Sequence, residues 1–151
     1  MSEKLYLEDV FVGQKFVTGT FTMTADAIKA FATDYDPQPF HTDEELVRST
    51  FFGGLVASGW HTASLTMSLV VQAFPIAGGV IGGGVDELRW PKPLRPGDEL
   101  RLEGGIVEVR PSQTKPRGLV RVRTTTLNRD GEPVQTMIAN LVVPRRPTEK
   151  A

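Results

Sequence analysis

The sequence contains no cysteine and only two histidines, His41 and His61. Without cysteine the chain cannot form a disulfide, bind zinc or an iron–sulfur cluster through thiolates, or use a thiol nucleophile. The two histidines are also too far apart in sequence to indicate a metal site. We therefore expect a protein without metal or cofactor, and any acid–base chemistry by an imidazole is confined to these two side chains.

The chain also lacks an excess of either charge, because 17 Lys and Arg balance 18 Asp and Glu to a net charge of −1. No global field favours nucleic acid or an anionic membrane as a partner. Residues 1–9 have no apolar core of the kind found in signal peptides. These features predict a cytoplasmic protein, and 151 residues are enough for one compact domain over residues 1–151.

Charged residues are absent from 49 to 85, which raises the question of a membrane span. Such a span needs about 20 predominantly apolar residues. Here His61, Gln72, Pro75 and five later glycines interrupt the run. We interpret it instead as a buried helix from about Ser58 to Phe74, followed by a glycine-rich turn.

The first half of the sequence carries helix signals. A short strand is expected over 15–22, and Thr24 is a good N-cap for a helix that must stop before Pro37. A capping-box pattern predicts a second short helix over 43–49. His41 would then lie in a proline-bounded connection between the two helices.

The second half alternates apolar and polar residues with period two, as half-buried antiparallel strands do. The alternation covers 88–90, 100–106, 120–123 and 134–143, with turn signals between the segments. One antiparallel sheet wrapped around the apolar helix accounts for both halves. The predicted class is therefore α+β with a hot-dog fold. Its exposed sheet edges favour a homodimer or a higher homo-oligomer.

Asp36 and His41 are the first candidates for chemistry, because two prolines stiffen the segment between them. A carboxylate and an imidazole around one water can add or remove water, since one takes a proton while the other gives one. The alternative is that Asp36 only ends a helix while His41 bonds a nearby backbone group. The spacing of the two residues alone is a weak pattern.

Gly59 is the second candidate feature, because it lies at the expected start of the buried helix. Free N–H groups there carry partial positive charge and suit a thioester oxygen that gains negative charge. The alternative is a glycine kept for packing.

Three segments together resemble a known family. Residues 35–43 (YDPQPFHTD), 52–59 (FGGLVASG) and 88–98 (LRWPKPLRPGD) look like the signature of the MaoC-like dehydratases, which include the (R)-specific enoyl-CoA hydratases. The resemblance covers nearly the whole chain. It implies a hot-dog dimer that acts on 2-enoyl thioesters without a cofactor.

By position, the resemblance implies that Asp36 and His41 are the catalytic pair and that the Gly59 N–H forms the oxyanion hole. The sequence departs from the hydratase motif Gly-Asp-x-Asn-Pro-x-His at two positions, with Tyr35 before the aspartate and Gln38 in place of asparagine. Ser58 stands where the enoyl-CoA hydratases often have histidine. We expect Gln38 and Ser58 to bind substrate. Because of these departures, the sequence does not determine the identity or the chain length of the acyl group.

The remaining candidates are weaker. His61 faces either the pocket or the core, where a hydrogen-bonded histidine is the favoured interpretation, and Trp60 is expected in the core. The glycines at 78–84 lack the lysine and serine or threonine of a phosphate loop. Coenzyme A phosphates require cations, and the candidates are Lys92, Arg95, Lys115 and Arg117.

The leading hypothesis is therefore hydration of a 2-enoyl thioester, or dehydration of its 3-hydroxyacyl counterpart. The thioester is expected to be an acyl-CoA or an acyl carrier protein conjugate. Two alternatives remain: a hot-dog thioesterase in which Asp36 activates water, and a non-catalytic module that binds acyl thioesters.

Overall fold

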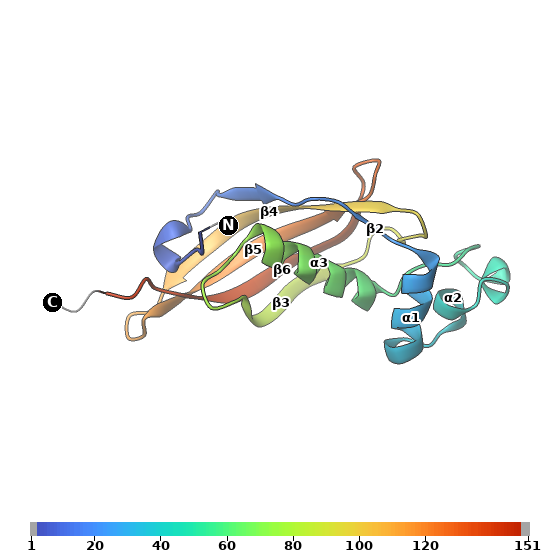
Figure 1. Ribbon diagram of the computed structural model, residues 1–151, viewed down its shortest axis with the longest axis horizontal. Helices are drawn as coiled ribbons and strands as arrows, with labels where there is room; N and C mark the ends of the chain where they lie inside the picture. Colours follow the sequence, from blue (N-terminus) through green and yellow to red (C-terminus); the bar gives the residue numbers. More distant parts are fainter. Residues whose placement is uncertain (1–2, 149–151) are drawn as a thin grey trace.

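The computed structural model describes residues 3–148. Figure 1 shows long strands and one long helix forming the body of the molecule, with the two helices of residues 25–42 at one end. In chain order the elements are η1 (Leu7–Asp9), β1 (Lys15–Val17), β2 (Phe21–Thr22), α1 (Ala25–Tyr35), α2 (Pro39–Thr42), η2 (Leu46–Ser49), α3 (Gly59–Ala73), β3 (Ile81–Arg89), β4 (Glu99–Pro111), β5 (Arg117–Leu127) and β6 (Pro133–Pro144).

The strands form one antiparallel sheet in the order β1-β4-β5-β6-β3, and β2 pairs with the start of β4. Strand β3 therefore lies at the edge beside β6, the last strand of the chain. Helix α3 packs against one face of this sheet (Figure 1). The α+β hot-dog fold predicted from the sequence is confirmed.

The first predicted helix is also confirmed, because α1 begins after Thr24 and ends before Asp36. The Thr24 hydroxyl accepts a hydrogen bond from the Ala27 N–H, which stabilises the start of the helix. Ile28 and Ala32 are fully buried one turn apart. Pro37 prevents the helix from continuing, so Asp36 is held at its C-terminal cap.

The predicted helix over 43–49 is wrong. The prediction that His41 lies in a connection between two helices is wrong as well. The chain forms α2 four residues earlier because Pro39 suits the first helical position. Asp43 then adopts an extended conformation, and its carboxylate accepts hydrogen bonds from the Glu45 and Leu46 N–H groups. Only the 3₁₀ turn η2 remains of the prediction, and His41 lies on α2.

Two clusters of buried apolar residues form the core. The larger one lies between α3 and the sheet and includes Phe74, Leu102 and Val122. The smaller one joins the α1–α2 region to the near end of the sheet through Ile28 and Leu100. The larger cluster includes Leu69 and Val70 of α3, and Leu65 of the same helix packs against the smaller cluster. The two clusters therefore contact different parts of α3.

A layer of buried polar side chains separates these clusters. Gln135 is fully buried and lies on β6 between Val134 of the smaller cluster and Met137 of the larger one. Its amide N–H donates to the Thr66 hydroxyl of α3, which is in turn hydrogen-bonded to Thr126 of β5. Buried polar groups are costly unless they are hydrogen-bonded, so these bonds hold α3 in register with the sheet.

The outer face of α3 is not covered by the rest of residues 3–148. Trp60 is 58% exposed, and Met67 and Val71 are also exposed. The prediction that Trp60 is a core residue is therefore wrong for the single chain, because the sheet covers only one side of the helix. No helix within residues 3–148 is long and apolar enough to cross a membrane.

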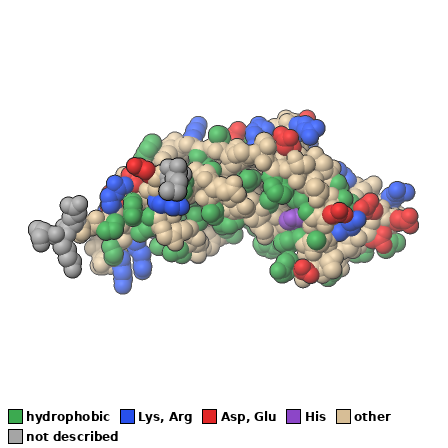
Figure 2. Space-filling model, viewed as in Figure 1, with side chains coloured by type: hydrophobic (Ala, Val, Ile, Leu, Met, Phe, Trp, Pro, Cys, Tyr) green, Lys and Arg blue, Asp and Glu red, His purple; other side chains and the backbone are tan. Residues whose placement is uncertain are grey.

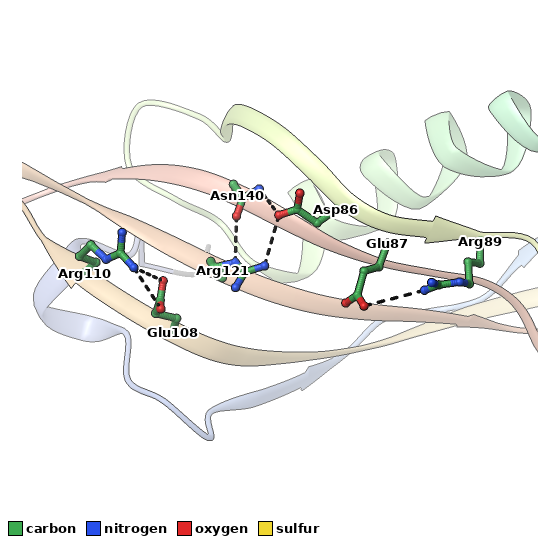
Figure 3. Close-up of polar contacts among 7 residues, drawn as sticks. All are labelled: Asp86, Glu87, Arg89, Glu108, Arg110, Arg121 and Asn140. Carbon is green, nitrogen blue, oxygen red and sulfur yellow. Dashed lines mark hydrogen bonds and ion pairs between the residues drawn. The ribbon is translucent and has the colours of Figure 1, made fainter.

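The face of the sheet opposite α3 carries charged side chains (Figure 3). Arg121 of β5 donates hydrogen bonds to Asn140 of β6 and to Asp86 of β3, and Asn140 also donates to Asp86. This network fixes the edge strand β3 to its neighbours. At the bulge that follows, Glu87 has a φ of 52°, a conformation that non-glycine residues rarely adopt.

The fold predicts effects of different size at two adjacent glycines of β4. A Cβ on Gly104 would lie 2.1 Å from the Phe16 ring, whereas one on Gly105 would meet nothing closer than 3.9 Å. We expect Gly104→Ala to lower the free energy of unfolding by about 1–3 kcal/mol, the usual effect of overpacking. Gly105→Ala is the matched control and should change it by less than about 0.5 kcal/mol. Urea unfolding measures both, and equal effects would contradict this packing.

Candidate active site

Asp36 and His41 come together where α1 ends and α2 begins. Pro37 and Pro39 turn the chain between them, and the His41 Nε2 lies 3.2 Å from an Asp36 carboxylate oxygen. The Gln38 side-chain amide donates a hydrogen bond to the other carboxylate oxygen. The short proline-bounded segment thus places a carboxylate and an imidazole in direct contact.

The other ring nitrogen of His41 is hydrogen-bonded to a backbone carbonyl. His41 Nδ1 lies 2.7 Å from the carbonyl oxygen of Val56, in the segment that leads into α3. A carbonyl can only accept, so Nδ1 carries a proton and donates it. Nε2 is then the ring nitrogen that faces the Asp36 carboxylate.

Several groups act on the ionisation of Asp36. Partial burial raises the pKa of its carboxyl, but hydrogen bonds from Gln38 and Ser58 and the nearby His41 outweigh it and lower the pKa below its usual value. Asp36 is therefore ionised at neutral pH. An ionised carboxylate beside a protonatable imidazole can orient a water and exchange protons with it.

Gly59 is the first residue of α3, and its N–H has no hydrogen-bond partner within residues 3–148. The Ser58 hydroxyl, which caps the helix, accepts from the Trp60 N–H instead. A free N–H at the start of a 15-residue helix suits an oxygen that gains negative charge.

His41 and Gly59 line one cavity of about 360 Å³. Its walls are largely apolar and aromatic, and they include Phe40, Phe52 and Trp90. Figure 2 shows histidine atoms reaching the surface near the end of α3 that points toward α1 and α2. The volume is at the small end of the range of about 300–1,000 Å³ found for ligand pockets.

The other candidate residues occupy different positions relative to Asp36 and the cavity. Ser58 is completely buried, and Gln38 is exposed on the solvent side of Asp36. Lys92 lines the cavity and pairs with Glu132. Arg95 donates to the Phe52 carbonyl oxygen at 2.8 Å.

Lys115 and Arg117 lie far from the cavity. They belong to the hairpin between β4 and β5, at the end of the sheet opposite α1 and α2 (Figure 1). Of the four candidate cations, only Lys92 and Arg95 are near the cavity. Within residues 3–148, no three His, Asp or Glu side chains cluster as they would at a metal site.

Sequence reasoning missed two groups that shape the site. The Val56 carbonyl holds His41 through a backbone atom, which no side-chain motif reveals. Trp90 reaches the cavity from the segment after β3, and its ring packs directly on Gly59. The only signal for Trp90 was its place in the segment 88–98 that resembles the family.

His61 does not line this cavity. It stacks on Phe31 of α1 with 4.6 Å between ring centres, and its buried Nδ1 has no hydrogen-bond partner within residues 3–148. The expected packing role fits this position, but the expected hydrogen bond at Nδ1 is missing. Burial lowers the pKa of the imidazole below its ordinary value of 6.5.

The sequence and the fold both match known proteins. Residues 9–128 match the family model described as "MaoC like domain". The MaoC-like dehydratase from Rhodospirillum rubrum is 50% identical, with a TM-score of 0.91 over 95% of this chain and 99% of that one. The (R)-hydratase from A. caviae involved in PHA biosynthesis is 28% identical, with a TM-score of 0.75 over 91% and 99% of the two chains.

A curated relative of uncharacterised function, YdeM of Bacillus subtilis, is 33% identical over 125 residues, which are 81% of this chain and 86% of that protein. The similarity therefore extends over most of the chain in both sequence and fold.

The buried His61 predicts a specific pH dependence of stability. Its pKa is lower in the folded chain than in the unfolded one, so below about pH 6.5 the unfolded chain binds this proton more readily. The free energy of unfolding should therefore fall as the pH falls through this range. The slope should stay below the limit of about 1.4 kcal/mol per pH unit for one proton, since the His61 side chain is partly exposed. His61→Phe should flatten this slope in urea titrations from pH 5 to 8. His41 is present in both proteins, so an unchanged slope would contradict the assignment.

Proposed function

Because this chain belongs to the MaoC-like domain family, we propose that it is a hydratase/dehydratase that adds water to a 2-enoyl thioester or removes it from a 3-hydroxyacyl thioester. One observation carries the proposal: His41, which contacts Asp36, lines one largely apolar cavity together with Gly59, whose N–H has no hydrogen-bond partner within residues 3–148. The (R)-hydratases among the structural neighbours support this reaction class.

The proposed reaction assigns one task to each group. A water held by Asp36 and His41 loses a proton to the pair, and its oxygen forms a bond to C3 of the enoyl group. The C2–C3 double bond becomes a single bond as electrons move toward the thioester oxygen, where the Gly59 N–H stabilises the negative charge. The pair then returns a proton to C2, so all atoms of the water end in the product.

Gln38 and Ser58 enter this proposal as groups around Asp36. Gln38 donates to the carboxylate, and the Ser58 hydroxyl helps to lower its pKa. We expect both residues to border the bound substrate. Their polar groups also keep Asp36 ionised, which the removal of a proton from water requires.

The thioester is proposed to be an acyl-CoA, with an acyl carrier protein conjugate as the alternative. Lys92 and Arg95 are the cations that support phosphate binding, because they lie beside the cavity. A cytoplasmic location, as expected from the sequence, is part of the proposal.

The proposal predicts that hydration depends on Asp36. Asp36→Asn removes the carboxylate and should lower kcat for crotonyl-CoA by about 10²–10⁴-fold, the range of general acid–base catalysis. Loss of absorbance of the enoyl thioester follows the reaction. Asp34→Asn is the matched control, since Asp34 is an exposed carboxylate in the last turn of α1, two residues before Asp36, and the activity of this variant should stay within about two-fold.

Release of free thiol that requires Asp36, without loss of the enoyl double bond, would replace the hydratase by a thioesterase. Binding of the thioester without turnover would indicate a binding module.

We also propose that the chain forms a homodimer through the free edge of β3. Ile81 and Val85 on this strand are 57% and 50% exposed, and the outer face of α3 beside it is apolar. An unpaired edge exposes backbone N–H and C=O groups that a second copy can satisfy. Such pairing would also cover Met67 and Val71.

This proposal predicts an effect that is specific to one edge of the sheet. Val85→Lys places a charge in the proposed interface and should weaken dimerisation at least ten-fold in sedimentation velocity. Val17→Lys is the control, because Val17 is 71% exposed on β1 at the opposite edge. Equal effects of the two changes, or a monomeric unmodified protein, would contradict the proposed interface.

A further inference from the structure

The cavity ends inside the protein at a defined chain of hydrogen bonds. Thr62 and Val134 line the cavity from α3 and β6. Their neighbours further along these elements, Thr66 and Gln135, are fully buried and do not line it. The cavity therefore stops where these two side chains bond to each other across the gap between helix and sheet.

Trp90, which is itself 41% exposed in the single chain, is joined to this inner boundary by a hydrogen bond. Its indole N–H donates to the Gln135 side-chain oxygen at 2.9 Å, and Gln135 donates to Thr66 at 3.1 Å. Thr66 and Thr126 are 2.8 Å apart. The hydrogen-bonded chain thus runs from the segment after β3, across β6, to α3 and β5.

The indole also lies directly on the start of α3. A Cβ on Gly59 would come within 2.5 Å of the Trp90 ring, so the ring occupies the space that a side chain would need. The same ring lines the cavity that holds His41 and Gly59. Trp90 is therefore next to the place where a thioester carbonyl would meet the Gly59 N–H.

The bonds to the indole make it a fixed wall. The Gln135 amide uses its oxygen for Trp90 and its nitrogen for Thr66. If the indole swung away, the buried Gln135 oxygen would lose its partner, and an unsatisfied buried polar group is costly. The ring is consequently held in place when the cavity is filled.

We propose that Trp90, anchored by Gln135, is the residue that limits the length of the acyl group. The inference rests on the proposed function. With the thioester carbonyl at Gly59 and the double bond at His41, the acyl tail extends into the buried, apolar part of the cavity. There it meets the wall formed by Trp90 and the Gln135–Thr66 bond. Short 2-enoyl groups fit the cavity of about 360 Å³, and longer ones require the space that the indole occupies.

The test compares 2-enoyl-CoA substrates of increasing length, from crotonyl- to octenoyl-CoA. The unmodified protein should prefer the short substrate. Trp90→Ala opens the inner end of the cavity, so the ratio of kcat/KM for octenoyl-CoA to that for crotonyl-CoA should rise at least ten-fold. Trp90→Phe keeps an aromatic ring without the N–H donor and should give a smaller rise.

Trp60→Ala is the matched control. Trp60 packs edge-on against Trp90 with 5.4 Å between ring centres but does not line the cavity, so the ratio should stay within two-fold. If Trp90 only supports the fold, both substrates lose activity equally and the ratio is constant. A constant ratio in folded Trp90→Ala and Trp90→Phe would overturn the proposal.

A second measurement separates this proposal from the reaction itself. Isothermal titration with the saturated butyryl- and octanoyl-CoA reports chain-length preference without turnover, and the same rise in the octanoyl-to-butyryl affinity ratio is expected for Trp90→Ala. If the unmodified protein hydrates no enoyl-CoA but this binding ratio rises, the proposed reaction fails and the role of Trp90 stands. If hydration occurs and neither ratio changes, the role of Trp90 fails alone.

Discussion

The hydrogen bond from His41 to the Val56 carbonyl joins the two parts of the site. One part is the α1–α2 segment that carries Asp36 and His41, and the other is the segment that leads into α3 and Gly59. A further bond from the Val56 N–H to the Phe40 carbonyl links the same two segments. The orientation of the imidazole follows from this contact, because His41 is buried and its Nδ1 is held by the Val56 oxygen while its Nε2 faces Asp36.

The buried polar side chains between α3 and the sheet form the inner end of the cavity. A core of apolar residues alone would be cheaper to bury than Gln135, Thr66 and Thr126. Each of these three side chains has a partner, and the chain of bonds ends on Trp90 at the cavity. The same interactions that keep the helix in register with the sheet therefore also determine the shape of the proposed acyl pocket.

Much of the fold could be predicted from the sequence because its signals are local. Thr24 and Pro37 set the ends of α1, the uncharged run indicated α3, and period-two alternation indicated β4, β5 and β6. It did not indicate most of β3, because the glycines at 82–84 were interpreted as part of a turn. The error over 43–49 arose because a proline at a helix start and a capping aspartate compete within a few residues. Trp60 was misplaced because apolar character does not tell whether the same chain or a second copy covers a helix face.

The candidate site likewise has residues that the sequence indicated and residues that it did not. Asp36, His41 and Gly59 could be selected from their spacing and from the family resemblance, and the fold brings the first two into contact. Val56 and Trp90 could not be selected. Val56 acts through its backbone carbonyl, and Trp90 lies in the segment after β3, far in sequence from the other residues of the site. Such contributions depend on tertiary packing, which periodicity and motifs do not encode.

The most direct test of the proposed reaction is the fate of oxygen from water. The protein is incubated with crotonyl-CoA in H₂¹⁸O, and the acyl products are analysed by mass spectrometry. A hydratase that uses Asp36 and His41 gives an intact 3-hydroxyacyl-CoA with one ¹⁸O at the hydroxyl group. Label in a free carboxylic acid, or unlabelled crotonyl-CoA alone, would contradict the account.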